Sequence, residues 1–236
     1  MIVREVDRDV QNCDSAYRDV VVEALRSLVS TKNYPCVAAI RSILGEDFSV
    51  GTYRKMGCVE STRLLSEDLK CFIAEQKKSK STYLSFVAAF QEPTNVTEKC
   101  FEELLWDQLS RLHELTSHEF SWDPKVCSDT SSPEFCFSFA NCGFFIVGMH
   151  PASSRKSRQF PFPVMVFNLF EQFEELKRLG MYEAMKTTNR ERDMKYQGSL
   201  NPMLERFGET AEAVQYSGRN VGDAWKCPFR MGKQDV

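Results

Sequence analysis

Two short apolar runs separated by a polar loop constrain most strongly what this chain can fold into. Residues 144–147 and 164–167 are apolar runs of the kind that form buried strands. Between them the chain breaks at Gly148 and presents His150, three serines and two arginines. Functional side chains are often placed on loops held by a rigid scaffold, so this loop is the first candidate for a site. A basic surface loop with a solvated histidine explains the same residues, and the pattern alone leaves both interpretations open.

Composition excludes several classes of protein. The chain has 236 residues, of which 42% are hydrophobic and 27% charged, as in an ordinary globular protein with one sizeable core. The net charge of −3 gives no basic field for nucleic acid or an anionic membrane. No apolar stretch approaches the length of a membrane span, and charges occupy the N-terminus where a signal peptide needs an apolar region. We therefore expect a cytoplasmic protein with no nucleic-acid or membrane partner.

Helical periodicity marks four segments. Residues 15–30, 61–76 and 97–118 are amphipathic, with Ser15, Ser61 or Thr62, and Thr97 as the expected N-caps. Residues 169–185 form another amphipathic helix, interrupted near Gly180, and 187–195 are its charged continuation. Residues 36–44 begin either a helix or a short strand; Pro35 favours a helix N-terminus with Cys36 in its first turn.

The expected strands lie at 82–90, 135–139 and 144–147, the last two joined as a hairpin by a turn at 140–143. Residues 45–60 contain three glycines and indicate a loop or hairpin. The tail, 198–229, is polar and irregular, but its aromatic residues favour wrapping around the body. We predict one α+β domain over 1–236, with a small mixed or antiparallel sheet, a flexible segment at 1–14 and a terminal tail at 230–236.

Nine cysteines are scattered along the chain without a CxxC pair, which argues against a zinc ribbon or a thioredoxin-type site. Cys36 follows a proline at an expected helix N-terminus, where partial positive charge favours the thiolate, so it suits a nucleophile or a metal ligand. Cys227 stands in Lys226-Cys227-Pro228-Phe229, and Cys-Pro pairs occur in some haem-contacting peptides. A buried structural thiol explains either cysteine equally well.

The loop between the two apolar runs holds the other candidates. His150, at a strand end beside serines and arginines, is better placed for chemistry than the other two histidines, although a histidine satisfied by a backbone carbonyl is the alternative. Arg155 and Arg158 are three residues apart and suit carboxylates if they face one way; otherwise they are exposed arginines. No dinucleotide-binding, P-loop, nucleophile-elbow or HExxH motif is present.

Several separated segments together resemble one known family. They are Tyr34-Pro35-Cys36, residues 83–90 with Pro93, Leu105-Trp106, Trp122-Asp123, residues 135–139, Gly148-Met149-His150-Pro151 with Ser154, Arg155 and Arg158, Val166-Phe167-Asn168, Asn201-Pro202-Met203-Leu204, Gln215-Tyr216-Ser217-Gly218-Arg219 and Trp225-Lys226-Cys227-Pro228-Phe229. In this order they resemble the YqcI/YcgG family, in particular the branch containing the haem-dependent N-hydroxylase of guanitoxin biosynthesis.

The resemblance implies a haem b protein that uses dioxygen and electrons to hydroxylate a nitrogen of a guanidine such as arginine, or of a related amine. It implies Cys36 as first choice for the axial ligand of the iron, with His150 and then Cys227 as alternatives. Arg155 and Arg158 would pair with the haem propionates.

Other residues of the resembling motifs also receive expected roles. Ser154 and Arg219, which lie in the same motifs, are expected to contact the cofactor. Independently of the motifs, Asp123 and Glu134 are carboxylates able to hold a substrate guanidinium, and nothing in their spacing singles them out.

Two other functions remain open. One is a non-enzymatic haem-binding or haem-sensing protein with the same ligands, and the other is a cofactor-free binding protein with a collapsed site. Nothing in the chain resembles a flavin or ferredoxin module, so an oxygenase of this kind needs a separate reductase. A homodimer is compatible with the sequence.

Overall fold

The two apolar runs are neighbouring strands in the middle of a sheet. In the computed structural model, which describes residues 15–79, 81–201, 212–222 and 224–231, β4 (Cys142–Met149) pairs antiparallel with β5 (Val164–Leu169). β5 also pairs antiparallel with β2 (Ser85–Glu92), which pairs parallel with β1 (Phe48–Lys55). β3 (Phe137–Phe139) forms the other edge, so the order is β1-β2-β5-β4-β3. The predicted mixed sheet is confirmed.

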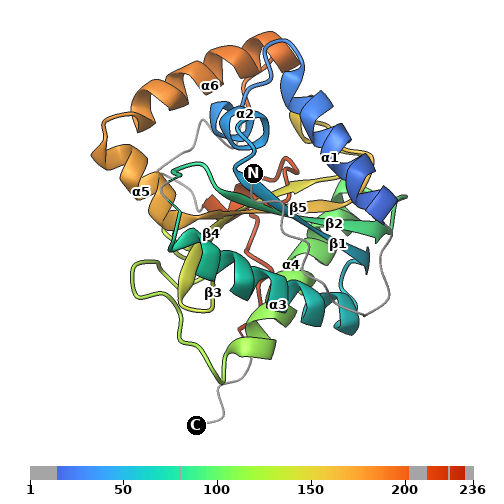
Figure 1. Cartoon of the computed structure of the whole chain (residues 1–236), viewed down its shortest axis with the longest axis vertical. Coiled ribbons are helices and arrows are strands. Elements are labelled where there is room, and N and C mark those ends of the chain that lie inside the picture. The colour runs from blue at the N-terminus through green and yellow to red at the C-terminus, as the bar shows by residue number, and fades with distance from the viewer. Residues whose placement is uncertain (1–14, 80, 202–211, 223, 232–236) are drawn as a thin grey trace.

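Helices cover both faces of this sheet (Figure 1). One face carries α3 (Val59–Gln76) and α4 (Glu98–Thr116). The other carries α1 (Ser15–Ser30), α2 (Val37–Leu44) and α6 (Tyr182–Gln197), while α5 (Phe170–Arg178) packs on β4 and β5 and leads into α6. The result is a single α+β domain of three layers, which confirms the predicted fold class.

The alternation of side chains along the strands creates two separate cores. In β2, Phe86, Ala88 and Phe90 belong to the core under α3 and α4, whereas Val87 and Ala89 belong to the core under α1 and α2. The first core is rich in aromatic rings and the second in aliphatic side chains. The two faces of the sheet therefore differ in chemistry as well as in neighbours.

The C-terminal tail completes the aromatic core. Tyr216 is 1% and Phe229 6% exposed, and both rings contact Trp106 of α4. The predicted wrapping of the tail is thus confirmed for its described part. Our expectations for residues 1–14 and for the last five residues lie outside the described part of the chain.

Two helix starts differ from the prediction because cysteine thiols act as caps. Thr97 caps α4 as expected, its Oγ1 accepting from the Cys100 N–H. α3, however, begins at Val59, and its cap is the Cys58 thiol rather than Ser61 or Thr62. Cys36 likewise lies one residue before α2 and caps it, instead of standing in the first turn.

The prediction of a loop or hairpin at 45–60 is wrong, because β1 occupies most of this segment. The glycines suggested a loop, but Gly51 is a strand residue. A Cβ there would lie 2.1 Å from the Tyr53 hydroxyl and 2.9 Å from the Phe86 ring. Glycine is needed at this position to let an aromatic side chain cross the strand.

The predicted hairpin and the predicted helix break are both confirmed. Ala140 and Asn141, with φ of 49° and 61°, form a two-residue loop between β3 and β4. Cys142 and Gly143, expected in the turn, already belong to β4. The helix predicted after Asn168 ends near Gly180 and resumes as α6.

Replacing Gly148 with alanine is expected to destabilise the fold by roughly 1–3 kcal/mol, the usual cost of overpacking. The added Cβ would lie 2.6 Å from the Phe101 ring and 2.8 Å from the Tyr216 carbonyl oxygen, which is backbone and cannot rotate away. Chemical denaturation measures the change. Gly222→Ala is the matched control, because no heavy atom lies within 4 Å of its added Cβ. Equal stability of the two variants would contradict the close packing of β4 against α4 and the tail.

Candidate functional site

A pocket lies between the sheet and the layer formed by α1, α2 and α6. Its floor consists of the side chains that β2, β4 and β5 direct to this face, among them Val87, Val147 and Val166. Leu25 of α1 and Ile43 of α2 close it from the side. The cavity measures about 280 Å³, near the lower limit of roughly 300 Å³ for drug-sized ligands. Its walls are mainly apolar, so its few polar groups define what it can bind.

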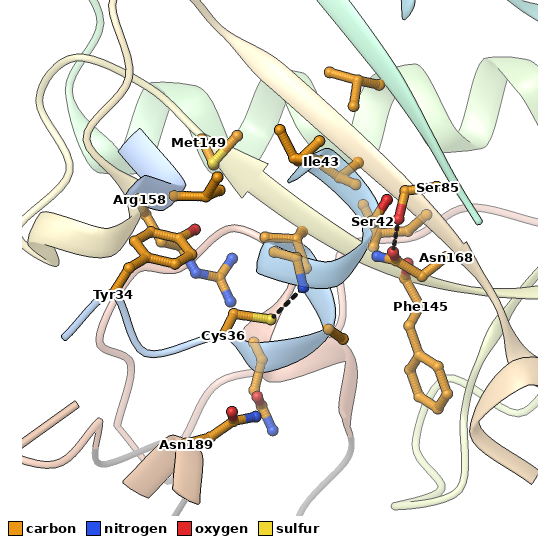
Figure 2. Close-up of a pocket in the computed structure, with 18 of the residues that line it drawn as sticks. Tyr34, Cys36, Ser42, Ile43, Ser85, Phe145, Met149, Arg158, Asn168 and Asn189 are labelled. Atoms are coloured by element: carbon orange, nitrogen blue, oxygen red, sulfur yellow. Dashed lines mark hydrogen bonds between the residues drawn. The ribbon is translucent and has the colours of Figure 1, made fainter. Parts of the chain in front are cut away.

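Cys36 lines this pocket at the N-terminus of α2 (Figure 2). Its Sγ accepts from the Ala39 N–H at 3.4 Å, and the next residue's backbone N–H donates to Asn189 Oδ1 of α6 at 3.0 Å. Burial raises the pKa of the Cys36 thiol, whereas the Ala39 and Ala38 N–H groups and the charge of Arg158 lower it. The thiol is thus held in place by its hydrogen bond, and the N–H groups and the cation around it favour its anion.

Arg158 brings a cation into the same pocket. It ends the short 3-10 helix η1 (Lys156–Arg158), and its Nη1 donates to the carbonyls of Gly148 and Tyr216 at 3.1 and 3.2 Å. Figure 2 shows the guanidinium directed toward the Cys36 thiol. Burial lowers the pKa of Arg158 to about 10, and the nearby Tyr34 hydroxyl and Cys36 thiol raise it.

The charge of Arg158 has no anionic partner in the part of the chain that the structure describes. Among the described residues, no carboxylate lies within ion-pair distance of its guanidinium. A partly buried cation of this kind is suited to an anionic group of a ligand.

Arg155 does not share this position. Its Nη2 donates to both carboxylate oxygens of Asp193 on α6 at 2.6 Å, and the two side chains are 10% and 4% exposed. Arg155 also contacts Ser199. The two arginines therefore do not face one way: Arg158 lines the pocket, and Arg155 ties the loop to α6 outside it.

Ser154 and Arg219 are also outside the pocket. The Ser154 backbone N–H and hydroxyl both donate to Glu98 Oε1 at 2.8 Å. Arg219 pairs with the buried carboxylate of Glu102, to which the Trp225 indole N–H also donates. These contacts fasten the loop and the tail to α4.

His150 is on the opposite face of the sheet from Cys36. Its ring is fully buried, with 0% exposure, and stacks on Phe101 of α4 at a centroid distance of 4.4 Å. Neither ring nitrogen has a hydrogen-bond partner among the described residues, so the alternative of a histidine satisfied by a carbonyl is not what the structure has. Burial lowers its pKa, while Glu98 raises it.

Cys227 lies on that same far face, packed against the aromatic core beside Phe229. Burial raises its thiol pKa to about 11. The three candidates for axial ligand are thus separated by the sheet, and Cys36 is the one that lines the pocket.

Neither candidate for holding a guanidinium lines the pocket. Asp123 is 4% exposed and accepts from the Gly143 and Lys125 N–H groups, which is a turn-stabilising role. Glu134 is exposed. Within the described ranges, no group of three or more His, Cys, Asp or Glu side chains is arranged to hold a bare metal ion.

Sequence reasoning missed the contribution of α6 and of three uncharged polar residues. Tyr182, Lys186 and Asn189 of α6 line the pocket, as do Ser42, Ser85 and Asn168. Ser85 and Asn168 are polar residues in otherwise apolar strands, at positions that face the pocket. Their polarity was the sequence signal that could have identified them as pocket residues. Nothing local in the charged sequence of α6 distinguishes a pocket wall from a solvated helix.

Fold and pocket define a three-layer α+β protein with a ligand cavity between its sheet and one helical layer. The profile of the YqcI/YcgG family matches residues 25–230, and the chain therefore belongs to the YqcI/YcgG family. The resemblance seen in the sequence is confirmed at the level of the family, and the branch stays a prediction. No curated protein and no solved structure matches. In the parts of the chain described, no helix is long and apolar enough to cross a membrane.

Replacing His150 with phenylalanine is expected to weaken the dependence of stability on pH. The folded pKa of His150 is lowered, so as pH falls below about 6.5 the unfolded chain takes up a proton that the folded chain resists. Stability is lost in that window by up to roughly 1.4 kcal/mol per pH unit. Denaturant unfolding at a series of pH values measures it.

The control for this test is the exposed His118 changed to glutamine, which removes a histidine without touching the buried ring. Identical pH profiles for wild type and His150→Phe would show that His150 is not a source of acid sensitivity.

Proposed function

We propose that this protein is a haem-dependent monooxygenase that hydroxylates a nitrogen of a small guanidine or amine. It uses dioxygen and takes its electrons from a separate reductase. Membership of the YqcI/YcgG family and the resemblance to its N-hydroxylating branch support the proposal. The observation that carries it is that Cys36 and Arg158, a thiol and a cation that pairs with no described carboxylate, lie in one mainly apolar pocket.

The donor set of the pocket fits haem b. The macrocycle is apolar, and the pocket walls are largely Leu, Val, Ile and Met side chains. The iron takes an axial ligand, which the half-buried Cys36 thiol can supply. The propionates are anionic, and Arg158 offers a forked guanidinium. The cavity of about 280 Å³ is not fully enclosed, and a group as large as haem would have to reach beyond it.

Each of these pocket residues has a separate role in the proposed site. Cys36 would hold the haem iron through its thiolate, and the N–H groups at the start of α2 and the charge of Arg158 favour loss of the thiol proton. Arg158 would hold a propionate. Haem, when bound, supplies the activation of dioxygen, which thiolate ligation favours. Lys186 and Arg190 of α6 add positive charge to the wall.

Some of the expected site residues receive no cofactor role in this proposal. Arg155, Ser154 and Arg219 serve the framework, since each is bound to Asp193, Glu98 or Glu102 outside the pocket. His150 and Cys227 lie across the sheet from the pocket and leave the axial position to Cys36.

The first test is the absorption spectrum of the full chain produced with added haem precursor. The ferrous–CO state of the wild type should show the long-wavelength Soret band of a thiolate-ligated haem. Cys36→Ala should abolish haem retention or remove that band, while Cys227→Ala, with the same change on the far face, should leave it. An unchanged spectrum in Cys36→Ala removes Cys36 as ligand, and a wild type without any Soret band rejects the haem proposal.

Arg158→Met is expected to lower haem affinity by about tenfold or more, because a charge-assisted hydrogen bond to a propionate is lost. Haem transfer to apomyoglobin measures it. Arg158→Lys keeps the charge and should retain part of the affinity.

Arg155→Met is the contrasting variant. It leaves buried Asp193 without its partner and should cost about 3–5 kcal/mol of stability. Any folded Arg155→Met protein should keep wild-type haem affinity. Loss of haem in Arg155→Met with wild-type affinity in Arg158→Met would reverse the two assignments.

Oxygen consumption decides between an enzyme and a haem sensor. With a surrogate reductase, the haem-loaded protein should consume dioxygen faster when L-arginine or L-lysine is added and should form a hydroxylated nitrogen, detected by mass spectrometry. Haem binding with no substrate-dependent consumption across a series of guanidines and amines would favour the sensor.

A further inference from the structure

Three uncharged polar side chains gather at the end of the pocket away from Cys36 and Arg158 (Figure 2). They are Ser42 on α2, Ser85 at the start of β2 and Asn168 on β5, and we name them the hydroxyl–amide cluster. Ser42 is 1% and Ser85 6% exposed. Cys36 and Ser42 both line the pocket and are separated by about 9 Å along the axis of α2 at 1.5 Å per residue. The thiol and the cluster therefore lie at different positions along the pocket.

The cluster is rigidly built. Ser85 and Asn168 are cross-strand partners, and the Ser85 hydroxyl donates to Asn168 Oδ1 at 2.8 Å. The Ser42 hydroxyl donates to the Asp47 carbonyl at 3.0 Å, and the Ser85 backbone N–H donates to that same oxygen at 3.2 Å. One carbonyl thus holds the two serines side by side, and the sheet holds the asparagine.

The hydrogen-bonding capacity that remains is mostly that of an acceptor. Each serine hydroxyl has one proton, and both protons are already donated within the protein. One Asn168 amide proton goes to the Phe145 carbonyl at 3.4 Å. The serine oxygens keep their lone pairs, and among the described residues no group donates to them. Their inward neighbours Val87 and Val166 are apolar, so at this end of the pocket these acceptors stand among apolar side chains.

We propose that the hydroxyl–amide cluster is the subsite that receives the nitrogen-rich end of the substrate. A guanidinium or ammonium group carries several N–H donors and no acceptor, and thus complements the serine oxygens and Asn168 Oδ1. Arg158, which would hold an anionic group such as a haem propionate, lies at the other end of the pocket. The chemical identity of the nitrogen group rests on the proposed N-hydroxylation, but its binding to the cluster does not require haem.

The test compares two amino acids with unbranched alkyl stems, L-arginine, which ends in a guanidinium, and L-norleucine, which ends in a methyl group. Isothermal titration calorimetry on the purified full chain gives both affinities, and the Soret band of the same sample records its haem content. Wild type should bind L-arginine at least about tenfold more tightly than L-norleucine, because donors on a charged group make strong hydrogen bonds.

Ser85→Ala and the double variant Ser42→Ala/Ser85→Ala should lose most of that ratio while keeping the affinity for L-norleucine. Ser30→Ala, at an exposed end of α1, should change neither affinity. An unchanged ratio in the double variant overturns the proposal. So does a wild type that does not prefer L-arginine, and so does an equal loss for both ligands, which would indicate a change in pocket shape.

Asn168→Asp keeps the proposal testable if a serine variant fails to fold, because it adds a charge beside the same acceptors. Its preference for L-arginine should rise at least about tenfold, and an unchanged or reduced preference in the folded variant counts against the subsite. Preference for L-arginine in a protein without a Soret band would retain the subsite and reject the haem proposal. Haem-dependent turnover that none of the three substitutions changes would retain the haem proposal and reject the subsite.

Discussion

The pleat of the three inner strands is the constraint on which the rest of this structure depends. Successive residues of β2, β5 and β4 point to opposite faces, so one set of side chains builds the aromatic core under α4 and the other lines the pocket. A shift of one residue in any of these strands would exchange phenylalanines for the valines and polar groups of the cavity. The register of the strands therefore determines both which side chains build the core and which line the pocket.

The same constraint explains why the candidate ligands separate as they do. Met149 and His150 are adjacent in sequence and fall on opposite faces, so the histidine stacks on Phe101 while the methionine faces the pocket. Arg155 and Arg158 separate for another reason, because the short η1 turn lies between them: Arg158 lines the pocket, and Arg155 turns to Asp193 of α6. Only Cys36, which enters from α2 and not from the sheet, meets Arg158 in the cavity.

Much of the fold could be predicted from the sequence, because periodicity and turn chemistry are local. The helix at 15–30, the Thr97 cap and the hairpin loop all follow from neighbouring residues. β1 was missed because Gly51 is required by a ring from Tyr53 that folds back over it, a contact that no window of sequence reveals. The composition of the pocket was also beyond local reasoning, since α6 joins α2 only through tertiary contacts such as Asn189 with the backbone after Cys36.

The buried ion pair between Arg155 and Asp193 lies outside the pocket but joins two of its walls. Arg155 precedes η1, which carries Arg158, and Asp193 is on the helix that supplies Asn189. An insertion or deletion in the loop would therefore be transmitted to α6 as a displacement of that helix. The loop and α6 should therefore vary together in evolution. Relatives in which the length of one differs should also differ in the other, and a change in pocket size should involve both.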